Sequence, residues 1–202
     1  MTRGQAARTS TDGRLLRSER SRQLIADALY ELLGEGDLQP SAQKVADRAG
    51  VGIRTVFRLF SDMDALYATV NVRLDLEAAP LLRGGPSEGA SLVERTQSLL
   101  AERVVLYERF GPYIRATNRY RNRSEFLAAE YRKLFLSLRE RLLRWLPELR
   151  DATADLVEAL DQATSFEAWD RLRNDQRLSR PRAQAAMHCA TQALVEKLED
   201  QT

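Results

Sequence analysis

Apolar residues recur along the chain at the spacing of amphipathic α-helices. The first clear example begins near Ser18 and ends at Gly34 and Gly36, and it carries six apolar residues three or four positions apart: Leu24, Ile25, Ala28, Leu29, Leu32 and Leu33. This period places them on one face of a helix, and glycines commonly end helices. No stretch has the alternation of a strand or a strand–turn–strand signal. The pattern predicts an all-α protein with about nine helices.

The other helices are expected between clear breaks in the pattern. Gly111-Pro112 should interrupt one helix, Pro147 should end another, and Pro181 suits a first helical turn. Residues 83–89 (RGGPSEG) are the clearest linker. The expected ranges are two short helices within 41–60, then 62–79, 87–110, 113–120, 124–145, 151–174 and 181–200.

The segment Ser41–Phe60 has the spacing of a helix-turn-helix. Ala46 is small at the point where two helices must approach closely, and Gly50 stands four residues later where the chain must turn. Val51 and Val56 can fill the gap between the two helices. Residues 52–55 then open the second helix and face outward. In this motif the N-terminal part of the second helix enters the major groove of DNA, so the segment predicts DNA reading.

Positions 44–67 read KVADRAGVGIRTVFRLFSDMDALY. This stretch resembles the motif of the tetracycline-repressor (TetR) family of transcriptional regulators, and eight positions agree: Val45, Ala46, Ala49, Gly50, Val51, Thr55, Phe60 and Leu66. The resemblance is specific over residues 18–75 and rests on helix layout beyond them. It implies a homodimeric regulator, most often a repressor, that leaves a palindromic operator when a small-molecule effector binds.

The resemblance divides the chain into three parts. It implies a flexible basic arm at 1–17, a helix-turn-helix domain at 18–62 and a helical effector-binding and dimerisation domain at 63–202. Within the motif the sequence departs from the family at four positions, where it has Gly52, Phe57, Leu59 and Met63. Three of these changes remove hydrogen-bond donors that would meet the DNA backbone. Arg54, Arg58 and the arm are the groups able to compensate.

The candidate DNA-binding residues are Ser41, Lys44, Gly52, Ile53, Arg54, Thr55, Phe57 and Arg58. Arg54 is expected to contact a base edge, most often guanine, and Thr55 a phosphate. Lys44 and Arg58 are expected to contact the DNA backbone. Ile53 can meet a thymine methyl or pack within the motif, and Phe57 can meet DNA or belong to the core.

In the family an effector pocket lies among the helices of the C-terminal half. Aromatic walls with a few polar groups suit a mostly apolar ligand. The candidate ligand-binding residues are Arg103, Tyr107, Phe110, Tyr113, Phe126, Tyr131, Phe135, Phe166 and Trp169. Ordinary core packing is the alternative for each of them.

The last two helices carry small and apolar residues that would let two copies form a four-helix bundle. The candidate dimer contacts are Leu156, Leu160, Ala183, Ala186, Met187, Ala190 and Leu194. Packing within one chain is the alternative. A separate run, RATNRYRNR at 115–123, carries four arginines. We expect this run to be a solvated face. The alternatives are a site for an anionic effector and a contact between the two halves.

Charge and composition narrow the function further. The net charge is +2, but the first 22 residues hold six arginines against two acidic residues, which suits contact with phosphates; a disordered, solubilising tail is the alternative. The single cysteine, Cys189, excludes an internal disulfide and suits a reducing compartment. No apolar run approaches the ~20 residues of a membrane span, and no secretory signal is present, so a cytoplasmic protein is expected.

Catalytic and metal-binding patterns are missing from the sequence. One histidine and one cysteine cannot form a multi-ligand His/Cys site, and His188 and Cys189 point about 100° apart on a helix. There is no GxSxG elbow, P-loop or GxGxxG. No enzyme activity, metal or cofactor is expected. The rival hypotheses are an all-α enzyme or scaffold with an incidental helix-turn-helix, and a DNA-binding regulator without an effector.

Overall fold

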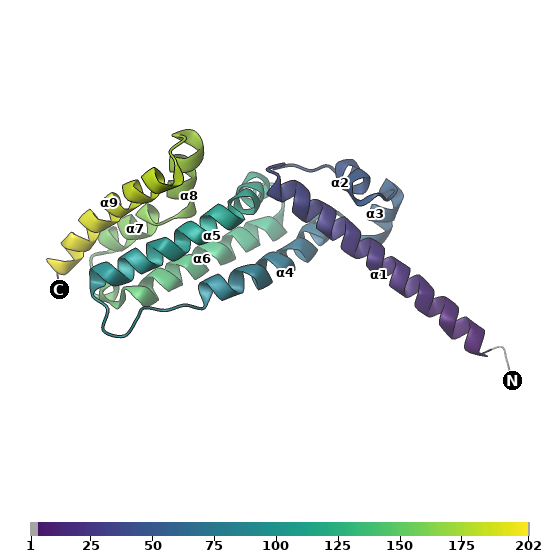
Figure 1. Ribbon diagram of the computed structural model, residues 1–202, viewed down its shortest axis with the longest axis horizontal. Helices are drawn as coiled ribbons and strands as arrows, with labels where there is room; N and C mark the ends of the chain where they lie inside the picture. Colours follow the sequence, from purple (N-terminus) through teal and green to yellow (C-terminus); the bar gives the residue numbers. More distant parts are fainter. Residues whose placement is uncertain (1–3, 202) are drawn as a thin grey trace. The chain divides into compact units, whose positions relative to one another are not determined.

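The computed structural model describes the backbone of residues 4–201 and the side chains of residues 15–201. Within that range the chain is all-α, as predicted, with nine α-helices and no strand (Figure 1). The helices are α1 (Gly4–Gly34), α2 (Ala42–Ala49), α3 (Ile53–Leu59), α4 (Met63–Leu82), α5 (Leu92–Tyr120), α6 (Glu125–Trp145), α7 (Ala154–Ala163), α8 (Phe166–Asp170) and α9 (Arg180–Glu199). A short 3₁₀ turn, η1 (Pro147–Arg150), and one π-helical turn, η2 (Arg171–Asp175), complete the elements.

Several boundaries differ from the prediction, and α4 for example continues past Pro80 to Leu82. Helix α1 begins at Gly4, well before the expected start at Ser18; the side chains of residues 1–14, and with them most of the expected basic arm, lie outside the described residues. Helix α5 passes through Pro112 without the expected break, and Phe110 and Tyr113 on either side of the proline are buried. The segment 151–174 is divided because the Ser165 side chain caps a new helix, α8. None of the described helices is long and apolar enough to span a bilayer.

The contacts divide the chain into two compact units. The first comprises the residues up to Leu76 together with Pro112–Ala129, and the second comprises Glu77–Gly111 together with the residues from Glu130 onward. Helices α4, α5 and α6 therefore each contribute to both units. This division differs from the boundary expected after residue 62, because the end of α5 and the start of α6 pack with the N-terminal helices.

The core of the first unit joins α1 to the helix-turn-helix. Helix α1 packs on both α2 and α3 (Figure 1), through buried residues that include Ile25, Leu29 and Leu32. Tyr113 of α5 completes this side, since its ring lies 4.9 Å from that of Tyr30. A Cβ on Gly34 would lie only 2.8 Å from the Tyr113 hydroxyl oxygen, so glycine permits this close approach.

The core of the second unit gathers around α6 and α9. Its buried members are Leu99, Leu142, Trp145, Leu146, Leu149, Leu156, Leu160, Val195 and Leu198. The buried Arg141 guanidinium fastens the linker that follows α4, because it donates to the carbonyl oxygens of Leu82 (2.6 Å) and Gly84 (2.8 Å) and pairs with Glu102.

A partly buried ion pair in this unit makes stability depend on pH. The Arg95 guanidinium donates to the Trp145 carbonyl (2.8 Å) and pairs with Glu148. The hydrogen bond from Arg95 lowers the pKa of Glu148 below its usual value. The charged carboxylate is therefore favoured in the folded state, and its stabilisation is present at neutral pH and lost as the pH falls through the folded-state pKa.

We expect Glu148→Gln to flatten the acid destabilisation of the protein. Between roughly pH 5 and pH 3 the free energy of unfolding should fall less steeply in the variant than in the wild type. The difference should stay below about 1 kcal/mol because the pair is partly solvated. Urea titrations followed by far-UV circular dichroism at several pH values measure it; parallel pH profiles would contradict the expectation.

Candidate nucleic-acid interface

The turn between α2 and α3 has the local geometry that the sequence predicts. Ser41 is the N-cap of α2, and its Oγ accepts a hydrogen bond from the Lys44 backbone N–H (3.2 Å). Gly50 ends the helix in the left-handed region, with φ 66° and ψ 32°. Residues with a side chain rarely adopt this conformation, so a glycine is favoured there. The Val51 N–H then closes the turn on the Ala46 carbonyl (3.0 Å).

Helix α3 packs on the rest of the first unit through one face and through its C-terminal end. Val56 and Phe60 are buried against the rest of the unit. Arg22 of α1 lies with its guanidinium 4.5 Å from the centre of the Phe60 ring and donates to the Leu59 carbonyl (2.7 Å). These contacts fix one face of α3 and leave the opposite face uncovered.

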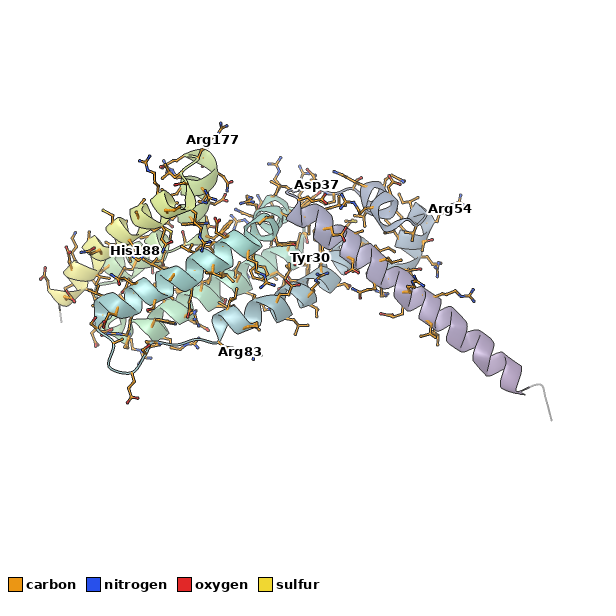
Figure 2. The ribbon with its side chains drawn as sticks, viewed as in Figure 1. Tyr30, Asp37, Arg54, Arg83, Arg177 and His188 are labelled. Carbon is orange, nitrogen blue, oxygen red and sulfur yellow. The ribbon has the colours of Figure 1, made fainter. Side chains whose placement is uncertain are left out.

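The uncovered face carries the predicted DNA-reading residues. Arg54 and Arg58 are exposed, and neither has an ion-pair partner among the described residues. Figure 2 shows Arg54 pointing away from the helices. Phe57 is 53% exposed, so it lies on the surface rather than in the core. Gly52, the N-cap of α3, is exposed as well.

Two other residues of the predicted set lie at the edge of this face. Ile53 and Thr55 are half-buried. The Thr55 backbone N–H donates to the Gly52 carbonyl (2.7 Å), which leaves its hydroxyl as the group able to reach a ligand. Together the face offers two guanidinium groups, one hydroxyl and one aromatic ring, the types of group that contact bases and phosphates.

The cations of α2 are engaged with acidic residues of the same unit. Lys44 pairs with Asp37 (2.5 Å), and Arg48 pairs with Glu35 (2.7 Å). The hydrogen bond from Lys44 lowers the pKa of Asp37, and the one from Arg48 lowers the pKa of Glu35. Lys44, expected at the DNA backbone, thus has an acidic partner in the free chain. The pair is solvent-exposed and therefore costs little to separate.

We expect Ser41→Ala to lower the free energy of unfolding by about 1 kcal/mol, because the first turn of α2 loses its side-chain acceptor. Urea titration measures the change. The control is Ser98→Ala, an exposed serine within α5, where alanine should be neutral or slightly stabilising. Equal stabilities of the two variants would show that the cap contributes nothing.

A solved structure has the same arrangement of helices. It is the crystal structure of a transcriptional regulator from Rhodococcus sp. Rha1, with a TM-score of 0.66 and 20% sequence identity. The match covers 87% of the present chain and 96% of the regulator. The chain shares the fold of a transcriptional regulator. No protein-family model and no curated sequence matches it.

The predicted ligand-binding residues are divided between the two compact units. Tyr113 and Phe126 belong to the first compact unit, and the other seven belong to the second. Phe135 is 47% exposed on α6. Aromatic content alone could not reveal this division, because it does not indicate in which unit a ring packs.

Within the second unit the polar members of the set are engaged by the protein itself. The buried Arg103 donates to the carbonyl (2.7 Å) and hydroxyl (2.6 Å) oxygens of Thr164 and to the Leu138 carbonyl (2.7 Å). The Tyr107 hydroxyl donates to the same Thr164 carbonyl (2.9 Å), and burial raises the Tyr107 pKa to about 12. The Phe166 ring meets Tyr107 edge-on, with centroids 5.5 Å apart.

Three further members of the set, Trp169, Tyr131 and Phe110, contact charged side chains of the second unit. The Trp169 indole N–H donates to Glu108 (3.2 Å), and the Tyr131 hydroxyl donates to Glu167. Phe110 is buried beside the Arg109 guanidinium. Among the described residues no cluster of histidine, cysteine and acidic side chains is placed to hold a metal ion.

The predicted dimer contacts divide into covered and accessible residues. Leu156, Leu160, Ala183 and Met187 are buried within the single chain, in line with the alternative of packing within one chain. The others are open to a partner to different degrees: Ala186 and Leu194 are half-buried, and Ala190 is exposed. Any dimer contact on α9 would therefore use its outer face.

Proposed function

We propose that the protein is a DNA-binding transcriptional regulator of the TetR type. In this proposal it is a cytoplasmic homodimer that acts as a repressor. The observation that carries the proposal is the helix-turn-helix whose second helix, α3, presents Arg54 and Arg58 outward without an acidic partner among the described residues. A pair of such helices related by two-fold symmetry would read the two halves of a pseudo-palindromic operator. The fold shared with a transcriptional regulator supports the proposal.

Regulation would act on the spacing of the two reading helices. A small molecule bound in the C-terminal half would favour a dimer in which the two α3 helices no longer match both half-sites at once. A ligand can shift such an equilibrium only by its differential affinity for the two states, and a modest difference suffices when both half-sites are released together.

Selection from random duplex DNA tests the proposal. The purified protein should enrich a two-fold symmetric sequence with half-sites about one helical turn apart, or a multiple of it. It should also prefer the DNA upstream of its own gene over a scrambled sequence, with an affinity that falls as salt rises. Failure to enrich any sequence, together with equal affinity for scrambled DNA, would refute it.

A regulator without an effector is the second candidate. It is favoured by the Arg103 region, where the side chains that we expected to orient a ligand are hydrogen-bonded to the protein's own oxygens. A small-molecule library screened by thermal shift separates the two candidates. A compound that raises the Tm and releases operator DNA supports an effector, whereas its absence leaves dimerisation as the role of this half.

A further inference from the structure

The helix-turn-helix has no excess of positive charge. Between Glu35 and Asp64 the chain has five acidic and four basic side chains. Two of those four cations, Lys44 and Arg48, pair with neighbouring acids. Duplex DNA is densely negative, and most of its affinity for proteins comes from Lys and Arg at its phosphates. Cations outside this segment would therefore add to the affinity, and the first unit holds them both in the arginines that precede the helix-turn-helix and in a second place.

The turn between α5 and α6 is rich in such cations. Residues 115–123 contain four arginines and no acidic residue. Three of them, Arg119, Arg121 and Arg123, have exposed side chains, and we call these three the basic turn. They lie in the same compact unit as α3.

Two side-chain contacts fasten the basic turn to the beginning of α4. The Ser124 hydroxyl, directly after Arg123, donates to the Asp64 carboxylate (2.9 Å). The Tyr120 ring, inside the turn, lies 5.9 Å from the Tyr67 ring. Asp64 and Tyr67 belong to the first two turns of α4, which starts only four residues after α3 ends. The basic turn is thus attached to the segment that directly follows the reading helix.

Backbone hydrogen bonds keep the turn itself in one conformation. The Arg121 N–H donates to the Thr117 carbonyl (2.9 Å), and the Arg123 N–H donates to the Tyr120 carbonyl (2.8 Å). Ser124 also caps α6, since its Oγ accepts from the Leu127 N–H (3.1 Å). The three guanidinium groups are therefore presented from a fixed backbone, which lowers the entropy cost of binding.

We propose that the basic turn is a second DNA contact, which binds the phosphate backbone beside the groove that α3 reads. The inference rests on the proposed function of α3 and adds a further source of electrostatic affinity. Because arginine binds phosphate oxygens through charge-assisted hydrogen bonds, and phosphates are the same in every sequence, the turn would strengthen binding without selecting bases.

The test compares two triple variants with the same reduction in charge. The first is Arg119→Gln/Arg121→Gln/Arg123→Gln. The matched control is Arg150→Gln/Arg180→Gln/Arg182→Gln, which removes three exposed arginines from the second unit. Affinities for the selected operator and for scrambled duplex DNA are measured across a salt series. Circular dichroism and the Tm check that both variants fold.

The basic-turn variant should show a salt dependence of log K that is flatter by about 0.9 for each phosphate that the turn neutralises in the wild type. Its affinity should fall by the same factor for operator and scrambled DNA, while the control keeps the wild-type slope. A third variant, with the three arginines of the turn replaced by lysine, should retain most of the slope because lysine keeps the charge.

A basic-turn variant with the slope of the control, or with an affinity change confined to the operator, would overturn the inference. If the wild-type protein itself shows no preference for any sequence, the proposed function of α3 fails first. If the wild type is selective and only the slope is unchanged, α3 still reads DNA and the turn has no part in it.

Discussion

Arg54→Ala is expected to weaken operator binding by roughly 5- to 150-fold, the equivalent of about 1–3 kcal/mol for one base-reading contact. The guanidinium stands in the first turn of α3, exposed and without an acidic partner among the described residues. Its removal should therefore weaken the interaction with DNA and disturb nothing within the protein. Binding to scrambled DNA should fall much less, so the ratio of specific to non-specific affinity should decrease.

The matched control for this substitution is Arg132→Ala, an exposed arginine on the part of α6 that belongs to the second unit. It changes the net charge equally and should leave the specificity ratio as in the wild type. Fluorescence anisotropy at constant salt measures both variants on both DNA sequences. An unchanged ratio for Arg54→Ala would assign this residue to the solvated surface and exclude its base-reading role.

Trp145→Ala is expected to lower the free energy of unfolding by about 3–5 kcal/mol, the range for removing a large aromatic side chain from a core. Trp145 is 2% exposed and lies within the apolar cluster around α6 and α9. Alanine would leave a cavity among leucines that already have partners on every side. A urea titration followed by far-UV circular dichroism measures the destabilisation.

Trp145→Phe separates the contribution of side-chain volume from that of the buried indole N–H at the same position. The indole N–H of Trp145 has no hydrogen-bond acceptor among the described residues, and an unsatisfied buried donor costs about 1–3 kcal/mol. Phenylalanine removes the donor and keeps most of the volume, so its destabilisation should be well below that of alanine. Equal effects in the two variants, or an alanine variant within about 1 kcal/mol of wild type, would contradict this account.

Local signals explain what the sequence predicts well. The turn at Gly50 and the all-α class depend on residues within one helical turn of each other, so spacing and residue type suffice. The apolar face of α1 is likewise predicted, with the exception of Leu24, which is 43% exposed. Exposure of Arg54 follows from the same period, because Val56 two residues later must face the core.

Long-range partners explain what the sequence does not predict. Nothing near Arg22 indicates that it binds the Leu59 carbonyl 37 residues away. The passage of α5 through Pro112 depends on packing around it, since proline removes one hydrogen bond of the helix and the neighbours must compensate. Leucines that suit an interface and leucines that suit a core look alike, so only burial placed Leu156 and Leu160 inside the chain.

The division of α5 between two units has an evolutionary consequence. The first unit includes Pro112–Ala129, which supplies Tyr113 to Tyr30 and Ser124 to Asp64. A recombination event that exchanged only the residues up to Leu76 would bring in α1–α3 and most of α4 without the partners that they were selected with. Under the proposed function, new DNA specificity would therefore arise more readily by point substitution on the outer face of α3 than by shuffling of the N-terminal segment.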